Sequence, residues 1–482
     1  MAIKHILIVG GGIAGLSAAY NAIKKTKELG IPVLVTLVES DSRWGGKIIT
    51  DRVALDEGQF IIEGGPDTFL ATKPWGVALC KELGLGERLQ GTNPHKKNTY
   101  VLHRNRLMLL PDGLAMMIPT NIQAILKTRL ISWFGKARMG LDFLLPPVQP
   151  NGDESLGAFV SRRLGREAYE NLIEPLMSGI YAGNGDALSL SSTFPYLRDL
   201  ELKYGSLARG ALEMRKQSVG KSVQGSRSAF LTPTTGLAEI VEALEAYLEA
   251  NHASLRLETP VSKILKTNSG YRVELEKGEA LRADCVILAT PAYISCALLS
   301  RLDPELAATL KEIPYASTAT ISLAYRLSDL PRELDGYGYI IPRREGRRAL
   351  ACTWTSTKFP HRAPEGYALI RVFIGRAGQD NAMPRDTDLL VALAREELQL
   401  TLGIEAEPLI SRVFVWENSM PQYNLGHPEK LARISKRLEK SPGLALAGNG
   451  YRGIGIPDCI HSGELAVNAL LPQLIMQNIE AN

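Results

Sequence analysis

The chain has 482 residues, which is more than one hydrophobic core supports, so two or three domains are expected. Hydrophobic residues make up 45% and charged residues 22%, as in ordinary globular proteins, and the dispersed net charge of +4 gives no indication of nucleic-acid binding. No apolar run reaches the roughly 18 residues that a membrane span requires. The five cysteines lack C-x-x-C spacing, and the first strand begins too early for a leader peptide, so we expect a cytoplasmic protein.

A strand followed by a glycine-rich turn opens the chain. Residues 6–9 are apolar, and G-x-G-x-x-G spacing follows before a helix predicted over 14–22. These glycines permit a tight turn, close helix–sheet packing and a close approach to a pyrophosphate, which the helix N-terminus attracts. A second strand, 33–38, ends at a carboxylate suited to a ribose. The pattern predicts a dinucleotide site made by Gly10, Gly11, Gly12, Ile13, Ala14, Gly15 and Glu39.

A second glycine pair follows directly after that carboxylate. Cationic side chains flank it, so the segment predicts a further contact with the pyrophosphate; an ordinary surface loop is the alternative. The order of the two glycine motifs resembles FAD-dependent amine oxidases more than NAD dehydrogenases. The candidate residues are Ser40, Arg43, Gly46 and Lys47.

A third glycine pair follows a strand pair predicted within 53–62. Glycine lets the backbone lie against a flat ring, because no Cβ intervenes. Lys73 is expected at the rim of the cavity beyond that ring. The ring-facing candidates are Gly64, Gly65, Pro66 and Asp67.

Residues 94–216 are predicted to form a helical domain. No acidic residue lies between Asp112 and Asp142, although four cations do. Apolar residues from Ile122 to Trp133 are predicted to share one helical face, with Thr120 as N-cap. Such a segment could lie on an anionic membrane or an acidic partner, or it could pack on its own domain. Residues 155–178 are predicted as two helices interrupted near Gly165.

Apolar segments typical of buried strands occur twice more in the rest of the chain. Strands are predicted at 255–257, 261–265, 271–275 and 283–291, and again at 444–447. A four-glycine loop then precedes a helix over 458–471, with Pro457 at its first position. That helix N-terminus could stabilise negative charge on a reduced flavin. We therefore predict a multi-domain α/β (α+β) fold with a Rossmann-type FAD-binding part (1–93, 217–292, 414–482), a helical domain (94–216) and a strand-rich substrate domain (293–413).

Six stretches resemble the oxygen-dependent porphyrinogen oxidases of haem synthesis: 63–69, 175–183, 351–355, 358–361, 416–423 and 448–459. The resemblance runs the length of the chain and is strongest to the soluble, Gram-positive-type branch. It implies an amine-oxidase-like fold and oxidation of coproporphyrinogen III, of protoporphyrinogen IX, or of both. Hydride would pass to FAD and O₂ would reoxidise it to give hydrogen peroxide. Removing six electrons takes three flavin cycles.

The resemblance also assigns further site residues. Lys73 suits a propionate at the mouth of an apolar cavity, with a solvated surface lysine as the alternative. Phe373 departs from close relatives, which carry tyrosine there. The implied FAD contacts beyond the glycine motifs are Val261, Trp416, Gly448, Ile454, Gly455, Ile456 and Pro457. The implied substrate contacts are Lys73, Ile180, Gly338, Ile340 and Phe373.

No residue is assigned a catalytic acid or base, and no metal-ligand spacing is found. His461 is expected to be structural. The alternatives are an amine oxidase, in which Tyr423 and Phe373 would imitate a flavin-facing aromatic pair, and a non-enzymatic binding protein on the same fold. The sequence leaves open the preferred porphyrinogen, a monomer or a homodimer, a ferrochelatase contact, and peripheral attachment to the inner face of the cell membrane.

Overall fold

The computed structural model describes residues 3–112, 114–115, 118–119, 121–149, 151–219, 228–379 and 383–480. Its first body is a parallel five-stranded sheet that unites the three segments predicted to bind FAD. Each central strand is buried on both faces, which is why it reads as a continuous apolar run. In spatial order the strands are β12 (Ser254–Arg256), β2 (Val33–Val38), β1 (Lys4–Val9), β16 (Cys285–Leu288) and β22 (Leu444–Leu446).

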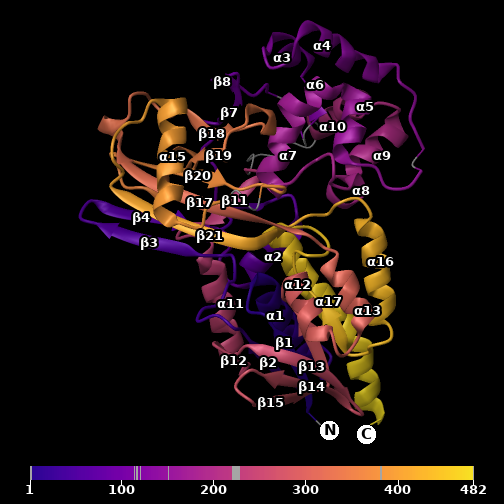
Figure 1. Cartoon of the computed structure of the whole chain (residues 1–482). Coiled ribbons are helices and arrows are strands. Elements are labelled where there is room, and N and C mark those ends of the chain that lie inside the picture. Colours follow the sequence, from indigo (N-terminus) through magenta and orange to yellow (C-terminus); the bar gives the residue numbers. More distant parts are fainter. Residues whose placement is uncertain are drawn as a thin grey trace.

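Both faces of this sheet are covered (Figure 1). One core joins Ile6 and Ile8 to α1 (Ile13–Glu28), α2 (Pro74–Glu82), α11 (Ala238–Ala250) and α17 (Ile456–Glu480). The core on the other face joins Leu7 and Val9 to an antiparallel sheet and three helices. These are β13 (Val261–Thr267), β14 (Gly270–Leu275), β15 (Ala280–Ala283), α12 (Ala292–Leu299), α13 (Pro304–Lys311) and α16 (His427–Leu438). The predicted Rossmann-type α/β fold of these segments is confirmed.

The second body is a mixed seven-stranded sheet. In spatial order it contains β21 (Ile410–Pro421), β17 (Tyr315–Arg326), β20 (Tyr367–Ile374), β19 (Ala349–Trp354), β18 (Gly336–Ile340), β7 (Asn98–His103) and β8 (Arg106–Leu109). Helix α15 (Thr387–Leu402), which the sequence reading missed, packs Leu390 and Leu398 against Ile321 on one face. The hairpin of β3 (Thr50–Leu55) and β4 (Gly58–Glu63) projects beside the sheet (Figure 1).

Two of the predicted domain boundaries disagree with the extent of this sheet. The predicted helical domain 94–216 begins with β7 and β8; β7 pairs with the distant strand β18, and β8 pairs with β7. The predicted boundary at 413/414 falls inside β21, so Trp416 belongs to the sheet over the site. Both differences come from long-range pairing, which local sequence periodicity does not reveal.

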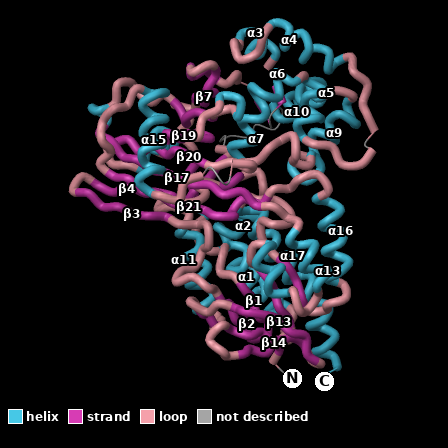
Figure 2. Tube along the Cα trace, viewed as in Figure 1, coloured by secondary structure: helices cyan, strands magenta, loops and turns pink. Residues whose placement is uncertain are grey.

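The helical body lies at the end of the molecule opposite the two chain termini (Figures 1 and 2). It contains α3 (Ile122–Lys127), α4 (Trp133–Gly140), α5 (Leu156–Leu164), α6 (Arg166–Ala168), a π-helical turn (Tyr169–Ile173), α7 (Glu174–Tyr181), α8 (Leu190–Thr193), α9 (Pro195–Tyr204) and α10 (Leu207–Val219). Besides short 3-10 turns, the remaining elements are β5 (Phe69–Leu70), β6 (Leu89–Gly91), β9 (Leu114–Ala115), β10 (Ile118–Pro119), β11 (Phe230–Pro233) and α14 (Thr355–Lys358).

The prediction of a single helical face from Ile122 to Trp133 is wrong. The backbone leaves the helical region at Thr128, and Ser132 caps a new helix by accepting a hydrogen bond from the Gly135 N–H. Thr120 lies outside the described residues, and the side chain of Asn121 caps α3. The interruption near Gly165 is confirmed, because that residue has φ of +92° between α5 and α6.

Candidate active site

The first glycine loop joins β1 to α1 at the carboxyl edge of the parallel sheet. Gly10 has φ of +106°, and a Cβ there would lie 2.8 Å from the Ala289 carbonyl oxygen. A Cβ at Gly15 would overlap the Gly10 carbonyl oxygen. In contrast, a Cβ at Gly12, the N-cap of α1, would meet no heavy atom within 4 Å. Gly10 and Gly15 therefore serve packing, while Gly12 leaves open space at the helix N-terminus, as a bound pyrophosphate requires.

Glu39 lies at the end of β2 beside this loop. Its Oε2 accepts a hydrogen bond from the Gly11 N–H at 2.6 Å, and its Oε1 accepts from the Asp41 N–H and the Ser40 hydroxyl, both at 2.9 Å. The carboxylate is thus fixed at the loop before any ligand binds. The Thr259 N–H donates to the Glu39 carbonyl at 2.8 Å, which brings the start of β13, and with it Val261, to the same edge.

The second glycine loop joins the first. The Gly45 N–H donates to the Gly11 carbonyl at 2.8 Å, so the two predicted pyrophosphate cradles are neighbours. The Arg43 guanidinium bonds the carbonyls of its own loop, among them Gly46 at 2.5 Å, and therefore braces this loop. The Lys47 ammonium donates to the Ser419 carbonyl, and burial lowers its pKa to about 8.

The third glycine loop lies against the seven-stranded sheet. The Gly64 carbonyl accepts hydrogen bonds from Thr320 Oγ1 at 2.7 Å and Trp416 Nε1 at 2.9 Å. A Cβ on Gly64 would lie 2.7 Å from the Phe414 ring, and one on Gly65 would overlap the Lys47 carbonyl. Glycine is therefore required here by the protein's own packing, which is a reason additional to the predicted flat ring.

A buried charge cluster surrounds this loop, and the sequence reading missed it. Arg362 and Glu63 form an ion pair of 2.6 Å, and Lys358 and Asp67 form one of 2.9 Å. Burial alone would raise the pKa of Asp67, but Lys358 and Arg371 outweigh it and lower that pKa to about 2. An arginine inside the apolar strand 367–374 is the sequence signal that could have revealed the cluster.

The C-terminal glycine loop precedes α17. A Cβ at Gly448 would meet no heavy atom within 4 Å, so this loop also borders open space. The Gly455 N–H donates to Asp458 Oδ2 at 3.2 Å, which fixes the turn between Ile454 and Pro457. Helix α17 begins at Ile456, one residue before the predicted first position.

Lys73 occupies the N-cap position of α2 and forms an ion pair. Its ammonium lies 2.6 and 2.7 Å from the two carboxylate oxygens of Asp458. The lysine side chain is 37% exposed and that of Asp458 is 12% exposed. The ion pair was not expected from the sequence. The propionate contact stays a prediction, and a substrate would have to share this lysine with Asp458.

The substrate candidates gather on the face of the sheet that carries Thr320. Cross-strand pairing places Ile340, Ala351 and Phe373 in one row across β18, β19 and β20, and Thr320 continues it. Ile340 and Phe373 pack in one apolar cluster with Ala182, just after α7. On α7, Ile180 is 46% exposed. A Cβ on Gly338 would overlap the Cys352 carbonyl, so that glycine is required by the sheet.

The predictions for two ring-bearing residues, Tyr423 and His461, have different outcomes. Tyr423 is fully buried, its hydroxyl bonds the Asn449 carbonyl, and its ring stacks on His427 at 4.3 Å. Its use in a flavin-facing aromatic pair with Phe373 is therefore wrong. His461 stacks on Trp75 at 4.0 Å and hydrogen-bonds Glu464, in agreement with a structural role.

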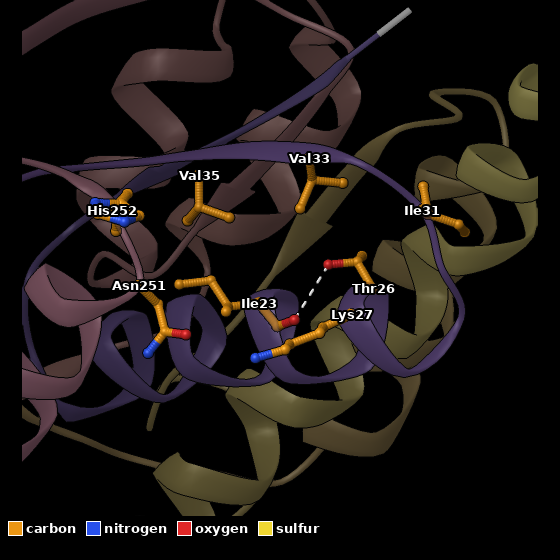
Figure 3. Close-up of a pocket in the computed structure, with 9 residues that line it drawn as sticks. Ile23, Thr26, Lys27, Ile31, Val33, Val35, Asn251 and His252 are labelled. Atoms are coloured by element: carbon orange, nitrogen blue, oxygen red, sulfur yellow. Dashed lines mark hydrogen bonds between the residues drawn. The ribbon is translucent and has the colours of Figure 1, made fainter. Parts of the chain in front are cut away.

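A surface pocket lies at the other edge of the parallel sheet (Figure 3). It is bordered by the second half of α1, the first half of β2 and the turn after α11, including Thr26, Val33 and His252. The glycine loops follow the carboxyl ends of the strands, where doubly wound sheets bind ligands. This pocket therefore belongs to the opposite edge and is separate from the candidate site.

Glycine loops at the carboxyl edge of a parallel sheet, a carboxylate suited to a ribose beside two of them, and a second sheet against a third are features of a flavoprotein oxidoreductase. The chain belongs to the flavin-containing amine oxidoreductase family, whose profile matches residues 13–471. It is an enzyme of that family, and its cofactor is FAD. The two open positions, at Gly12 and Gly448, fit that group.

Named relatives cover nearly the whole chain. Coproporphyrinogen III oxidase of Bacillus subtilis (strain 168) is 39% identical over 98% of both chains. Human protoporphyrinogen oxidase is 29% identical over 97% of this chain and 98% of its own. A crystal structure from Exiguobacterium sp. 255-15 has a TM-score of 0.85 at 33% identity and covers 98% of this chain and 100% of that one.

None of the helices that the structure describes combines the length and the hydrophobicity needed to cross a bilayer.

Proposed function

We propose that this protein is an oxygen-dependent porphyrinogen oxidase of haem biosynthesis. Its substrate is coproporphyrinogen III, protoporphyrinogen IX, or both, and its products are the porphyrin and hydrogen peroxide. The observation that carries the proposal is the 39% identity to a coproporphyrinogen III oxidase over 98% of each chain. Bound FAD supplies the hydride acceptor that O₂ restores, and the chain supplies orientation and electrostatics.

In this proposal each group of site residues has a separate task. The loops around Gly12 and Gly448 and the carboxylate of Glu39 hold the dinucleotide. The row of Ile340 and Phe373 and the facing helix α7 offer apolar surface to the macrocycle and exclude water. Lys73 supplies a cation for a propionate.

Initial rates on both porphyrinogens test the function. With the FAD-loaded protein in air, we expect porphyrin fluorescence to rise with three peroxide molecules released per porphyrin. A faster rate with one porphyrinogen identifies the preferred substrate. Peroxide from a polyamine with none from either porphyrinogen would instead establish an amine oxidase. A colourless protein that does not take up FAD would establish the non-enzymatic alternative.

We also propose that the tip formed by α3 and α4 attaches the enzyme peripherally to the inner face of the cell membrane. Ile125 and Leu130 are buried, so half of this segment packs on its own domain. Trp133 and Phe134 are 72% and 90% exposed, and the Lys136 ammonium lies 4.4 Å from the Trp133 ring centroid. Exposed aromatic rings beside cations suit the interface of an anionic bilayer.

Vesicle co-sedimentation tests this attachment. Wild-type protein should bind phosphatidylglycerol vesicles at low salt and release at high salt, while the double variant Trp133→Ser/Phe134→Ser should bind at least tenfold more weakly. Leu400→Ser, which removes another exposed apolar side chain, on α15, is the control. Equal binding by all three proteins would refute the assignment of α3 and α4 as the membrane-binding surface. If the double variant instead loses binding only to ferrochelatase, the tip is the contact for that enzyme.

A further inference from the structure

The charge cluster at the third glycine loop carries one cation more than it carries carboxylates. Glu63, Arg362 and Arg371 are at most 3% exposed. Arg362 pairs with Glu63 and Lys358 pairs with Asp67, whereas Arg371 takes part in none of the ion pairs found among the described residues. Burial lowers the pKa of Arg371 while the two carboxylates oppose that shift, and a guanidinium keeps its charge at neutral pH.

Arg371 also orients the loop. It extends from β20, and its Nη2 donates to the Gly64 carbonyl at 3.3 Å and to the Gly65 carbonyl. Thr320 and Trp416 bond the same Gly64 carbonyl from the same sheet. In a planar trans peptide the C=O and the next N–H point in opposite directions. The Gly65 N–H is therefore turned away from the sheet, and within the described part of the chain it has no hydrogen-bond acceptor.

We propose that Arg371 is a positioning residue for the flavin, which turns the Gly65 N–H toward the cofactor and supplies the cluster's unpaired positive charge. Reduction of a flavin adds negative charge. A fixed cation in a water-poor interior stabilises that charge more strongly than one in solvent. Arg371 thereby favours the reduced cofactor. The inference deepens the proposed function but requires only the FAD site, so its test does not depend on which substrate is oxidised.

The two-electron midpoint potential of bound FAD tests this role without any substrate. Anaerobic dye equilibration measures it, and absorbance gives the FAD content. Arg371→Gln should lower the ratio of reduced to oxidised flavin at least tenfold at a fixed potential, which is a shift of about 30 mV. Arg371→Lys keeps the charge, but its ammonium ends one bond short of the Nη2 atom that bonds both carbonyls, so it should hold the loop less firmly. In this variant the ratio of reduced to oxidised flavin should stay within threefold of the wild-type ratio, while FAD should dissociate faster.

Two further variants separate the charge from its surroundings. Lys358→Met removes a different cation from the same cluster and leaves the Arg371 contacts in place, so it should also lower the ratio about tenfold. Arg385→Gln removes an arginine whose side chain is 79% exposed, and it should change nothing. The proposal is overturned if Arg371→Gln and Lys358→Met keep the wild-type potential. It is equally overturned if Arg371→Lys falls as far as Arg371→Gln. If Arg371→Gln fails to retain FAD, Lys358→Met and Arg371→Lys decide the question by the same criteria.

Discussion

The pair of Lys73 and Asp458 allows a sharp test of substrate binding. Removing the ammonium by Lys73→Ala should weaken the binding of a propionate. An exposed pair contributes about 0–1 kcal/mol and a desolvated pair contributes more. Because the Lys73 side chain is 37% exposed, about 1–2 kcal/mol is a fair range. That range corresponds to a rise in KM of roughly five- to thirtyfold. A propionate lies away from the carbon that loses hydride, so kcat should change by less than about threefold.

The partner residue supplies the second half of the test. In the free enzyme Asp458 competes with the substrate for Lys73, so Asp458→Asn should leave KM unchanged or lower it a few fold. The amide oxygen can still accept from the Gly455 N–H, which preserves the turn. Lys24→Ala, which removes a lysine paired with Glu82 at similar exposure, is the control. Steady-state porphyrin fluorescence gives both constants. A KM within twofold of wild type in Lys73→Ala would leave this residue without a substrate role.

Three further predictions concern FAD binding and stability. Glu39→Ala removes a carboxylate, and the lost charge-assisted hydrogen bonds of about 1.5–3 kcal/mol should weaken FAD roughly ten- to a hundredfold; equal affinity by flavin fluorescence titration would refute the ribose assignment. Arg163 and Asp142 form a fully buried ion pair, so Arg163→Met leaves the Asp142 carboxylate without its cation and should lower the free energy of unfolding in urea by about 3–5 kcal/mol; a loss below 1 kcal/mol would contradict this. The pKa of Asp67 is lowered from 3.8 to about 2 in the folded state, so its contribution of about 2 kcal/mol is complete above pH 4 and is lost as the pH falls toward 2; Asp67→Asn should lack that part of the acid dependence of stability, and an unchanged profile would contradict the assignment.

The opening βαβ unit could be predicted because each of its signals is local. Strand β2 has the predicted bounds, and α1 and β1 differ only at their ends. Helix α1 runs on to Glu28 because Tyr20, Ala22 and Thr26 are buried, although the charged residues between them weaken the apolar pattern. Strands β7 and β8 could not be predicted as part of the sheet, since β7 pairs with β18, more than 200 residues away along the chain, and β8 joins the sheet through β7.

The glycine motifs show that one sequence pattern can have more than one physical cause. Close helix–sheet packing was predicted for the first glycine motif, and Gly15 agrees with it, whereas Gly65 and Gly338 were predicted to serve ligand contact. At all three positions the obstructing atoms are backbone carbonyls of the protein itself. Among the glycines assigned to the site, Gly12 and Gly448 are the two at which an added Cβ would meet no heavy atom within 4 Å. A substitution at the first three positions should therefore destabilise the fold, whereas a small side chain at Gly12 should weaken FAD binding and spare the apoprotein. Gly448 has φ of +115°, so a side chain there would also strain the backbone.

That difference separates the two kinds of glycine by experiment. Gly12→Ala adds one methyl group where no atom lies within 4 Å, so the unfolding free energy of the apoprotein should stay within about 1 kcal/mol of wild type. FAD affinity should fall at least tenfold, because the pyrophosphate must approach the N-terminus of α1 closely. Urea unfolding of FAD-free protein and flavin fluorescence titration measure the two quantities. Normal affinity in Gly12→Ala would show that the open space at this helix is not where the dinucleotide binds.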